Sequence, residues 1–133
     1  VQFLNWFRFN VKDGIEAKRI CKVSGRYKLN DNFKWDDPAY EGKYVFVKHH
    51  QSNSPRKDEL NLKGLFVVRC WHMDSALLDN FERVIENIAN DCASLGIDAE
   101  NCYYKNIPKD LLYEVEKIGV EGYVSPVGVY ENE

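Results

Sequence analysis

The sequence lacks the patterns that identify a membrane span, a nucleotide-binding loop and two common hydrolase sites. No apolar run approaches the roughly 20 residues that a helix needs to cross a membrane. The turn Met73-Asp74-Ser75, which joins a predicted strand to a predicted helix, contains no glycine for a phosphate cradle. The G-x-S-x-G and H-E-x-x-H patterns are missing as well. We therefore predict no membrane segment, no cofactor and no metal.

The four cysteines, Cys21, Cys70, Cys92 and Cys102, show no CxxC spacing. Cys70 falls in a predicted buried strand and Cys92 on an apolar helix stripe, where each serves as a small core side chain. This favours reduced thiols and a cytoplasmic location, with one or two disulfides as the alternative. The first residues show neither the basic nor the long apolar segment of a signal peptide, and a leader removed before Val1 is left open.

Length and charge narrow the class of protein further. A chain of 133 residues with 44% apolar residues predicts one domain, spanning residues 1–133. Its core is large enough to be stable without disulfides or a structural metal. The net charge of −3 argues against a protein whose main role is to coat nucleic acid.

The stretch from Leu62 to Leu95 is the clearest structural signal in the chain. Gly64 to Met73 predicts a buried strand, because Leu65 to Val68 form a continuous apolar run. Asp74 or Ser75 then caps a helix that ends at Gly96. Apolar residues follow that helix at spacings of three and four, as in Leu77, Leu78, Phe81, Val84, Ile85, Ile88, Cys92 and Leu95.

The remaining elements are predicted from periodicity and turn residues. Strands are expected at residues 1–11, 26–29, 43–50, 100–107 and 123–130. Pro108 is expected to begin a second helix with the stripe Leu111, Leu112, Val115 and Ile118. Ile15 to Ser24 favours a short helix, and a strand that follows a turn at Asp13-Gly14 is the alternative.

These elements predict an α+β fold. We expect a mainly antiparallel sheet of about five strands, with two or three helices packed on one face. The nearest named architecture is the ferredoxin-like split βαβ arrangement.

An aromatic loop between Asn30 and Gly42 is the leading candidate for a binding surface. It carries Phe33, Trp35 and Tyr40, with Asp36 and Asp37 between them. Aromatic side chains are enriched at recognition surfaces, because they bring a large contact area at a low entropy cost. The alternative is that these rings fold back and cover the core.

Two other groups of residues suggest different functions. His50 and His72 each lie at the end of a predicted strand, and they would serve a hydrolase or nuclease as acid and base if the strands were neighbours. The basic residues Lys18, Arg19, Lys22 and Arg26 are close in sequence, and on a helix Lys18 and Lys22 share a face suited to RNA.

The sequence favours a non-catalytic protein that binds a macromolecule, most simply another protein, as inhibitors and immunity proteins do. The binding residues on this hypothesis are Phe33, Trp35, Asp36, Asp37 and Tyr40. A small hydrolase using His50 and His72 is the first alternative, and an RNA-binding module is the second.

Overall fold

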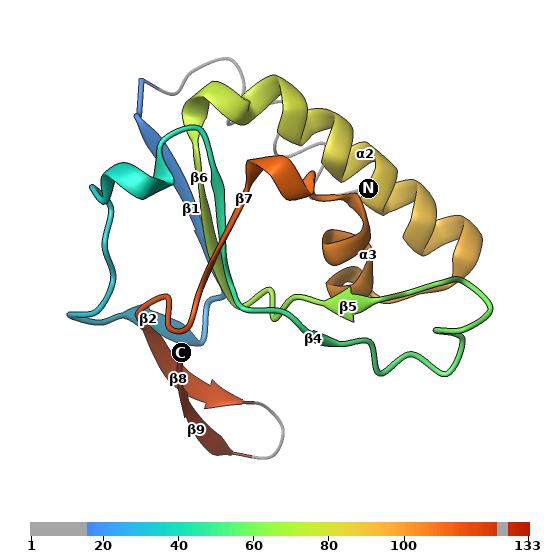
Figure 1. The fold of residues 1–133 in the computed structure, drawn as a ribbon. Coiled ribbons are helices and arrows are strands. Elements are labelled where there is room, and N and C mark those ends of the chain that lie inside the picture. Colours follow the sequence, from blue (N-terminus) through green and yellow to red (C-terminus); the bar gives the residue numbers. More distant parts are fainter. Residues whose placement is uncertain (1–15, 125–127) are drawn as a thin grey trace.

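The computed structural model describes residues 16–124 and 128–133 (Figure 1). Within these residues the chain forms nine β-strands in three sheets, together with two α-helices. The predicted α+β class is therefore confirmed. In the same ranges no helix is both long and apolar enough to cross a membrane. The strand predicted for residues 1–11 lies outside the described residues.

The largest sheet has four strands in the order β1-β6-β3-β7. Strand β6 pairs antiparallel with both β1 and β3, whereas β3 pairs parallel with β7. The bounds of these strands are Arg19–Val23 for β1, Tyr44–Val47 for β3, Cys70–Asp74 for β6 and Leu112–Val115 for β7.

Two smaller sheets complete the described structure. One has the order β2-β8-β9, and the other is the pair β4-β5. The expected single sheet of about five strands is thus divided among three sheets, and the ferredoxin-like arrangement is not confirmed. The bounds are Tyr27–Leu29 for β2, Val120–Val124 for β8, Val129–Asn132 for β9, His50–Gln51 for β4 and Gly64–Leu65 for β5.

The long helix expected after Asp74 is confirmed as α2, Leu78–Leu95. The Asp74 carboxylate caps the preceding 3₁₀ turn Ser75–Leu77 by accepting a hydrogen bond from the backbone N–H of Ala76. Gly96 ends the helix with a φ of 64°, a left-handed conformation that costs glycine little. The buried side chains of α2 keep the predicted spacing, at Phe81, Val84, Ile85 and Ile88.

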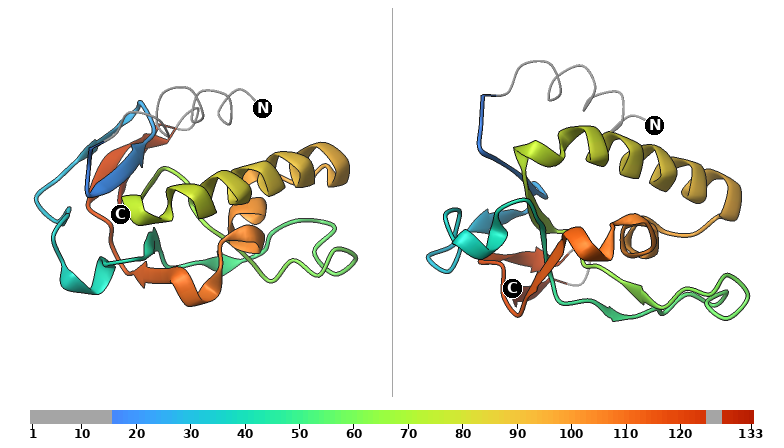
Figure 2. Two further views of the ribbon diagram at one scale, coloured as in Figure 1. Left: turned by 90° about the horizontal axis from the view of Figure 1, so that it is seen from above. Right: turned by 45° about the horizontal axis from the view of Figure 1, so that its top comes forward.

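Strand β6 has both of its faces buried, and its side chains alternate between two cores. Trp71 and Met73 belong to the larger core, together with Tyr44, Phe46 and the buried stripe of α2. Cys70 packs in a smaller core with Val47, Ile118 and Val120, toward the β2-β8-β9 sheet. Figures 1 and 2 accordingly show α2 and the β8–β9 hairpin in separate parts of the molecule, joined through the four-stranded sheet.

Three sequence predictions around this sheet are corrected. Residues Arg19–Val23 form an edge strand, not the favoured helix, because each of them pairs with a residue of β6. The predicted strand from Gly64 to Met73 is broken into β5 and β6, since the Phe66 N–H turns away to donate to the Glu100 carbonyl. The last strand is a hairpin, β8–β9.

The segment that follows α2 also differs from its prediction. The expected strand at 100–107 is helix α3, Ala99–Asn106. Asp98 begins it by accepting a hydrogen bond from the Asn101 N–H at 2.9 Å, and Cys102 and Tyr103 pack on the larger core. The helix expected after Pro108 is only the 3₁₀ turn Lys109–Leu111, because the next residues pair with β3 as β7.

Gly119 connects the smaller core to the aromatic loop, and we expect Gly119→Ala to lower the free energy of unfolding by about 3 kcal/mol or more. Gly119 has a φ of +88°, and a Cβ atom there would lie 2.2 Å from the backbone nitrogen of Phe33. Gly96→Ala is the matched control, because Gly96 also has a positive φ but has open space around it. Denaturant unfolding of both variants measures the difference, and equal losses would contradict the close approach of loop and glycine.

Candidate functional site

The aromatic loop is tied to the rest of the fold at both of its ends. At its start, the Asn30 N–H donates to the Gly119 carbonyl at 2.9 Å. At its end, the Gly42 N–H donates to the Asp74 carboxylate at 2.8 Å. Burial acts to raise the pKa of Asp74, but the hydrogen bonds from Gly42 and Ala76 outweigh it and lower that pKa. The loop therefore rests on a charged carboxylate at the end of β6.

Inside the loop, a short 3₁₀ helix fixes the backbone beside Trp35. The helix spans Pro38–Tyr40, and the Asp37 side chain caps it by accepting from the Ala39 N–H at 2.9 Å. Proline at the first position suits this conformation, because its φ is already restricted. The segment after Trp35 is therefore ordered before any partner binds.

Arg19 of β1 joins the loop to His72 of β6. Its Nε and Nη2 groups lie 3.1 and 2.8 Å from Nδ1 of His72, and Nη1 donates to the Tyr40 carbonyl at 2.7 Å. Because a guanidinium only donates hydrogen bonds, His72 Nδ1 is the acceptor and the ring is neutral. Burial first, and the nearby Arg19 charge second, lower the pKa of His72 to about 4.

Three aromatic rings of the loop surround the buried His72 ring. The centroids of Phe33, Trp35 and Tyr40 lie 5.4, 6.2 and 5.2 Å from the imidazole centroid. Phe33 and Trp35 also meet edge to face at 4.7 Å, a favoured geometry for aromatic pairs. Tyr40 continues the contact to Tyr113 of β7 at 5.3 Å. His72 thus provides the surface on which the loop is assembled.

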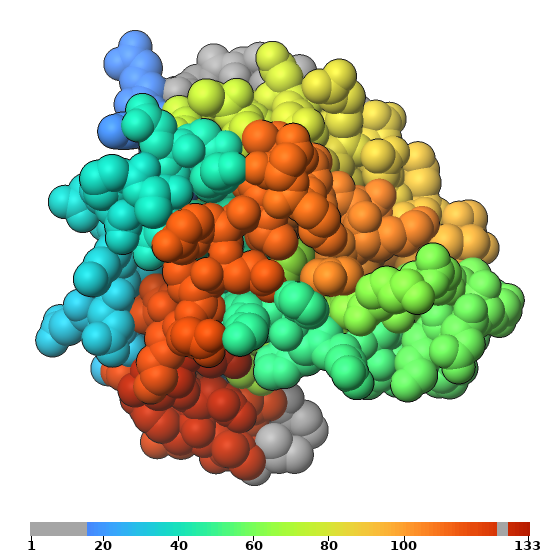
Figure 3. Space-filling view, viewed as in Figure 1, coloured from blue at the N-terminus to red at the C-terminus, as the bar shows by residue number. Residues whose placement is uncertain are grey.

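A surface cleft of about 450 Å³ opens beside this assembly. We call it the Trp35 cleft, and its lining residues are Lys18, Arg19, Trp35, Asp36, Asp37, Pro38 and Glu41. It brings the aromatic loop together with Lys18 and Arg19 of the basic segment, although the sequence suggested separate functions for the loop and for that segment. Figure 3 shows the loop, coloured light blue to teal, at the surface beside the orange segment that contains β7.

The loop combines both roles that the sequence left open. Tyr40 is buried and Phe33 is half-buried, so these two rings cover His72. Trp35 is 45% exposed, and Asp36 next to it is exposed as well. The covering rings and the exposed ring are in contact, so the core side of the loop supports the exposed side.

The structure does not bring His50 and His72 to one site. His72 lies opposite Val45 at the start of β3, whereas His50 lies opposite Leu65 in the separate β4–β5 pair. His50 is five residues further along the chain than Val45, a separation of roughly 16 Å for an extended chain. His72 is also neutral, covered by rings and bonded to Arg19, so its environment suits packing and not proton transfer with His50.

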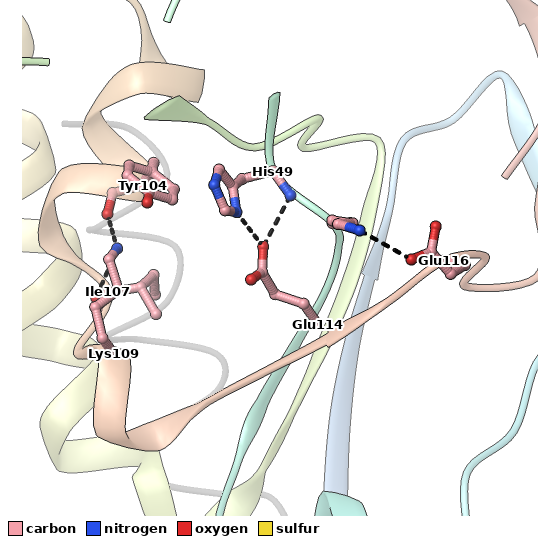
Figure 4. Close-up of polar contacts among 7 residues, drawn as sticks. His49, Tyr104, Ile107, Lys109, Glu114 and Glu116 are labelled. Carbon is pink, nitrogen blue, oxygen red and sulfur yellow. Dashed lines mark hydrogen bonds and ion pairs between the residues drawn. The ribbon is translucent and has the colours of Figure 1, made fainter. Parts of the chain in front are cut away.

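His49 has a carboxylate partner, Glu114 (Figure 4). Both its backbone N–H and its Nδ1 contact Glu114 Oε1, at 2.8 and 2.7 Å. Its ring lies 4.8 Å from that of Tyr104. The Tyr104 ring in turn contacts the Lys109 ammonium, 3.8 Å from the ring centroid, and the Phe66 ring, 5.2 Å away. This cluster ties the end of β3 to β7 and to α3. No local sequence pattern predicts this cluster, because only the β3–β7 pairing brings Glu114 to His49.

The basic segment does not form the predicted helical face. Lys22 turns back into the fold and donates to Ser24 Oγ at 2.8 Å and to the Val68 carbonyl. Arg26 is exposed in the turn between β1 and β2. Only Lys18 and Arg19 reach the Trp35 cleft, so the four residues are not one phosphate-binding surface.

Comparison of this chain with family models, with curated protein sequences and with solved structures finds no match.

We expect stability to fall as the pH is lowered from about 6.5 toward 4, because the unfolded chain then protonates His72 while the folded ring stays neutral. The lowered pKa of about 4 corresponds to roughly 3 kcal/mol across this range. Denaturant titrations at several pH values measure the slope. His72→Gln should lose this part of the slope and the His49→Gln control should keep it. An unchanged slope in His72→Gln would show that His72 is not held neutral.

Proposed function

We propose that this chain is a non-catalytic binding protein that recognises another protein through the Trp35 cleft. The observation that carries the proposal is a half-exposed tryptophan held in place by a buried aromatic assembly. Tryptophan is among the residues that most often dominate the energy of a protein interface. Inhibitors and immunity-type proteins belong to this class, because they act on their partners by binding alone.

Preorganisation of the loop supports this function. Binding is weakened when side chains and loops must first be ordered, at a cost of about 0.5–1.5 kcal/mol for each side chain immobilised. Trp35 already has contacts with Phe33 and His72, and the backbone after it is held by Asp37 and Pro38. A partner that covers Trp35 therefore meets a surface whose conformation is set by the fold.

The charges around the cleft suit a protein surface of mixed charge. Lys18 and Arg19 line one part of it, while Asp36, Asp37 and Glu41 contribute carboxylates. Charged groups around an aromatic centre raise the association rate and exclude wrongly charged partners. The hydrolase alternative has less support, because His50 and His72 belong to different strand pairs. The RNA alternative has less support as well, because Lys22 is bonded inside the fold.

We expect Trp35→Ala to weaken binding of the cognate protein by roughly 30-fold or more, the loss typical of an interface hot spot. The matched control is Tyr123→Ala, which removes another exposed aromatic ring from β8. Proteins captured from the source cell by the immobilised chain identify the partner, and dissociation constants of the purified pair measure the effect. Circular dichroism and thermal unfolding verify that both variants fold.

The control separates this cleft from the rest of the surface. Loss of binding with Trp35→Ala and retention with Tyr123→Ala support the proposal. Equal affinity of Trp35→Ala and the wild-type chain would overturn it. Loss of binding with Tyr123→Ala alone would show that the interface lies on the β8–β9 hairpin, where the ring centroids of Tyr123 and Tyr130 are 5.3 Å apart.

A further inference from the structure

Two thiols face each other where α2 meets α3. Cys92 lies in the last part of α2, and Cys102 lies in α3, beyond the turn that contains Gly96. Their Sγ atoms are 3.3 Å apart, and all four described cysteines are free thiols. A disulfide bond is about 2.05 Å long, so a small movement of the two side chains brings the sulfurs within bonding distance.

A second pair of thiols is close but less suited to bonding. Cys21 of β1 and Cys70 of β6 have their Sγ atoms 4.0 Å apart. The strand register places Cys21 opposite His72 and Cys70 opposite Val23, so the two cysteines are diagonal neighbours. Diagonal positions on paired strands are about 7–8 Å apart, beyond the 4.4–6.8 Å that the Cα atoms of a disulfide usually span. The rigid pairing of β1 with β6 opposes the movement that would bridge them.

The two thiols of the helix pair differ in their access to solvent. Cys92 is half-buried, whereas Cys102 is fully buried and donates weakly toward the Ile97 carbonyl, 3.8 Å away. Burial, with the neighbouring Cys92, raises the pKa of the Cys102 thiol. Cys92 is therefore the thiol that a small oxidant in solution reaches first, and Cys102 is the resolving thiol next to it.

We propose that Cys92 and Cys102 form an oxidation site for hydrogen peroxide that closes into a disulfide between α2 and α3. The Cys92 thiolate attacks one peroxide oxygen, the O–O bond breaks, and Cys92 sulfenic acid and hydroxide form. The Cys102 sulfur then attacks the Cys92 sulfur. The S–O bond breaks, and the hydroxide that leaves takes the Cys102 proton to form water. Overall, two thiols lose two electrons and two protons, and one peroxide becomes two water molecules.

Closure of this bond leaves the fold in place. The same interface already carries polar contacts from Asp91 of α2, which accepts hydrogen bonds from Lys105 at 2.9 Å and from Asn106 at 2.8 Å. The disulfide adds a covalent link where the helices are already held together. We therefore expect the oxidised chain to unfold at a temperature several degrees higher, and a thiol reductant to reverse the change.

Peptide mapping after peroxide treatment tests this site directly. After denaturation and alkylation of free thiols, a glutamate-specific protease places the four cysteines on separate peptides, 17–41, 60–82, 87–100 and 101–114. We expect a linked pair 87–100 with 101–114, lighter by two hydrogens than the sum of the two peptides. The link should disappear after reduction.

Two variants serve as matched controls. Cys92→Ser should abolish the link and the rise in unfolding temperature. This variant keeps the buried Cys102, so the buried side chains of the core are not altered. The double variant Cys21→Ser, Cys70→Ser should retain both. A link between 17–41 and 60–82 in place of the expected one would overturn the proposal. Alkylation of Cys92 and Cys102 as free thiols, or a Cys92 sulfinic acid with no link, would overturn it too.

Discussion

The burial of β6 on both faces is the constraint on which the rest of this structure depends. Trp71 and Met73 need an apolar layer on one side, and Cys70 and His72 need a covering on the other. Helices α2 and α3 supply the first layer, and the β2-β8-β9 sheet and the aromatic loop supply the second. A strand in this position cannot slip by one residue without exchanging its two faces, so it fixes the register of its neighbours.

His72 shows how a polar residue is accommodated in such a strand. Buried polar groups are usually hydrogen-bonded, and Arg19 on the next strand supplies the partner of His72 Nδ1. The same guanidinium reaches the Tyr40 carbonyl, so satisfying the histidine also anchors the loop. The exposed Trp35 is in turn supported by Phe33 and by the imidazole. The cleft is therefore a consequence of how the fold satisfies one buried ring.

Sequence patterns predicted well those elements whose signal is local. The stripe of α2 and its end at Gly96 follow from a period of 3.6 and a left-handed cap, and both are confirmed. Segments whose partners are distant were predicted less well. The tyrosines of α3 predicted a strand. The segment is a helix because Asp98 caps its first turn and its buried face packs on the larger core. The stripe after Pro108 suggested a helix, but pairing with β3 made it a strand.

The candidate site also has one part that follows from the local sequence and another that depends on residues distant in sequence. The sequence by itself determined that Phe33 to Tyr40 belong to a polar, aromatic loop, because Asp37, Pro38 and Gly42 oppose a strand or an α-helix there. Only the tertiary structure decided that Lys18 and Arg19 lie beside Trp35, and that Cys92 faces Cys102. Arg19 and His72 are 53 residues apart in sequence, and their contact depends on the β1–β6 register. Local periodicity determines the conformation of a segment, but strand register and helix packing decide which side chains meet.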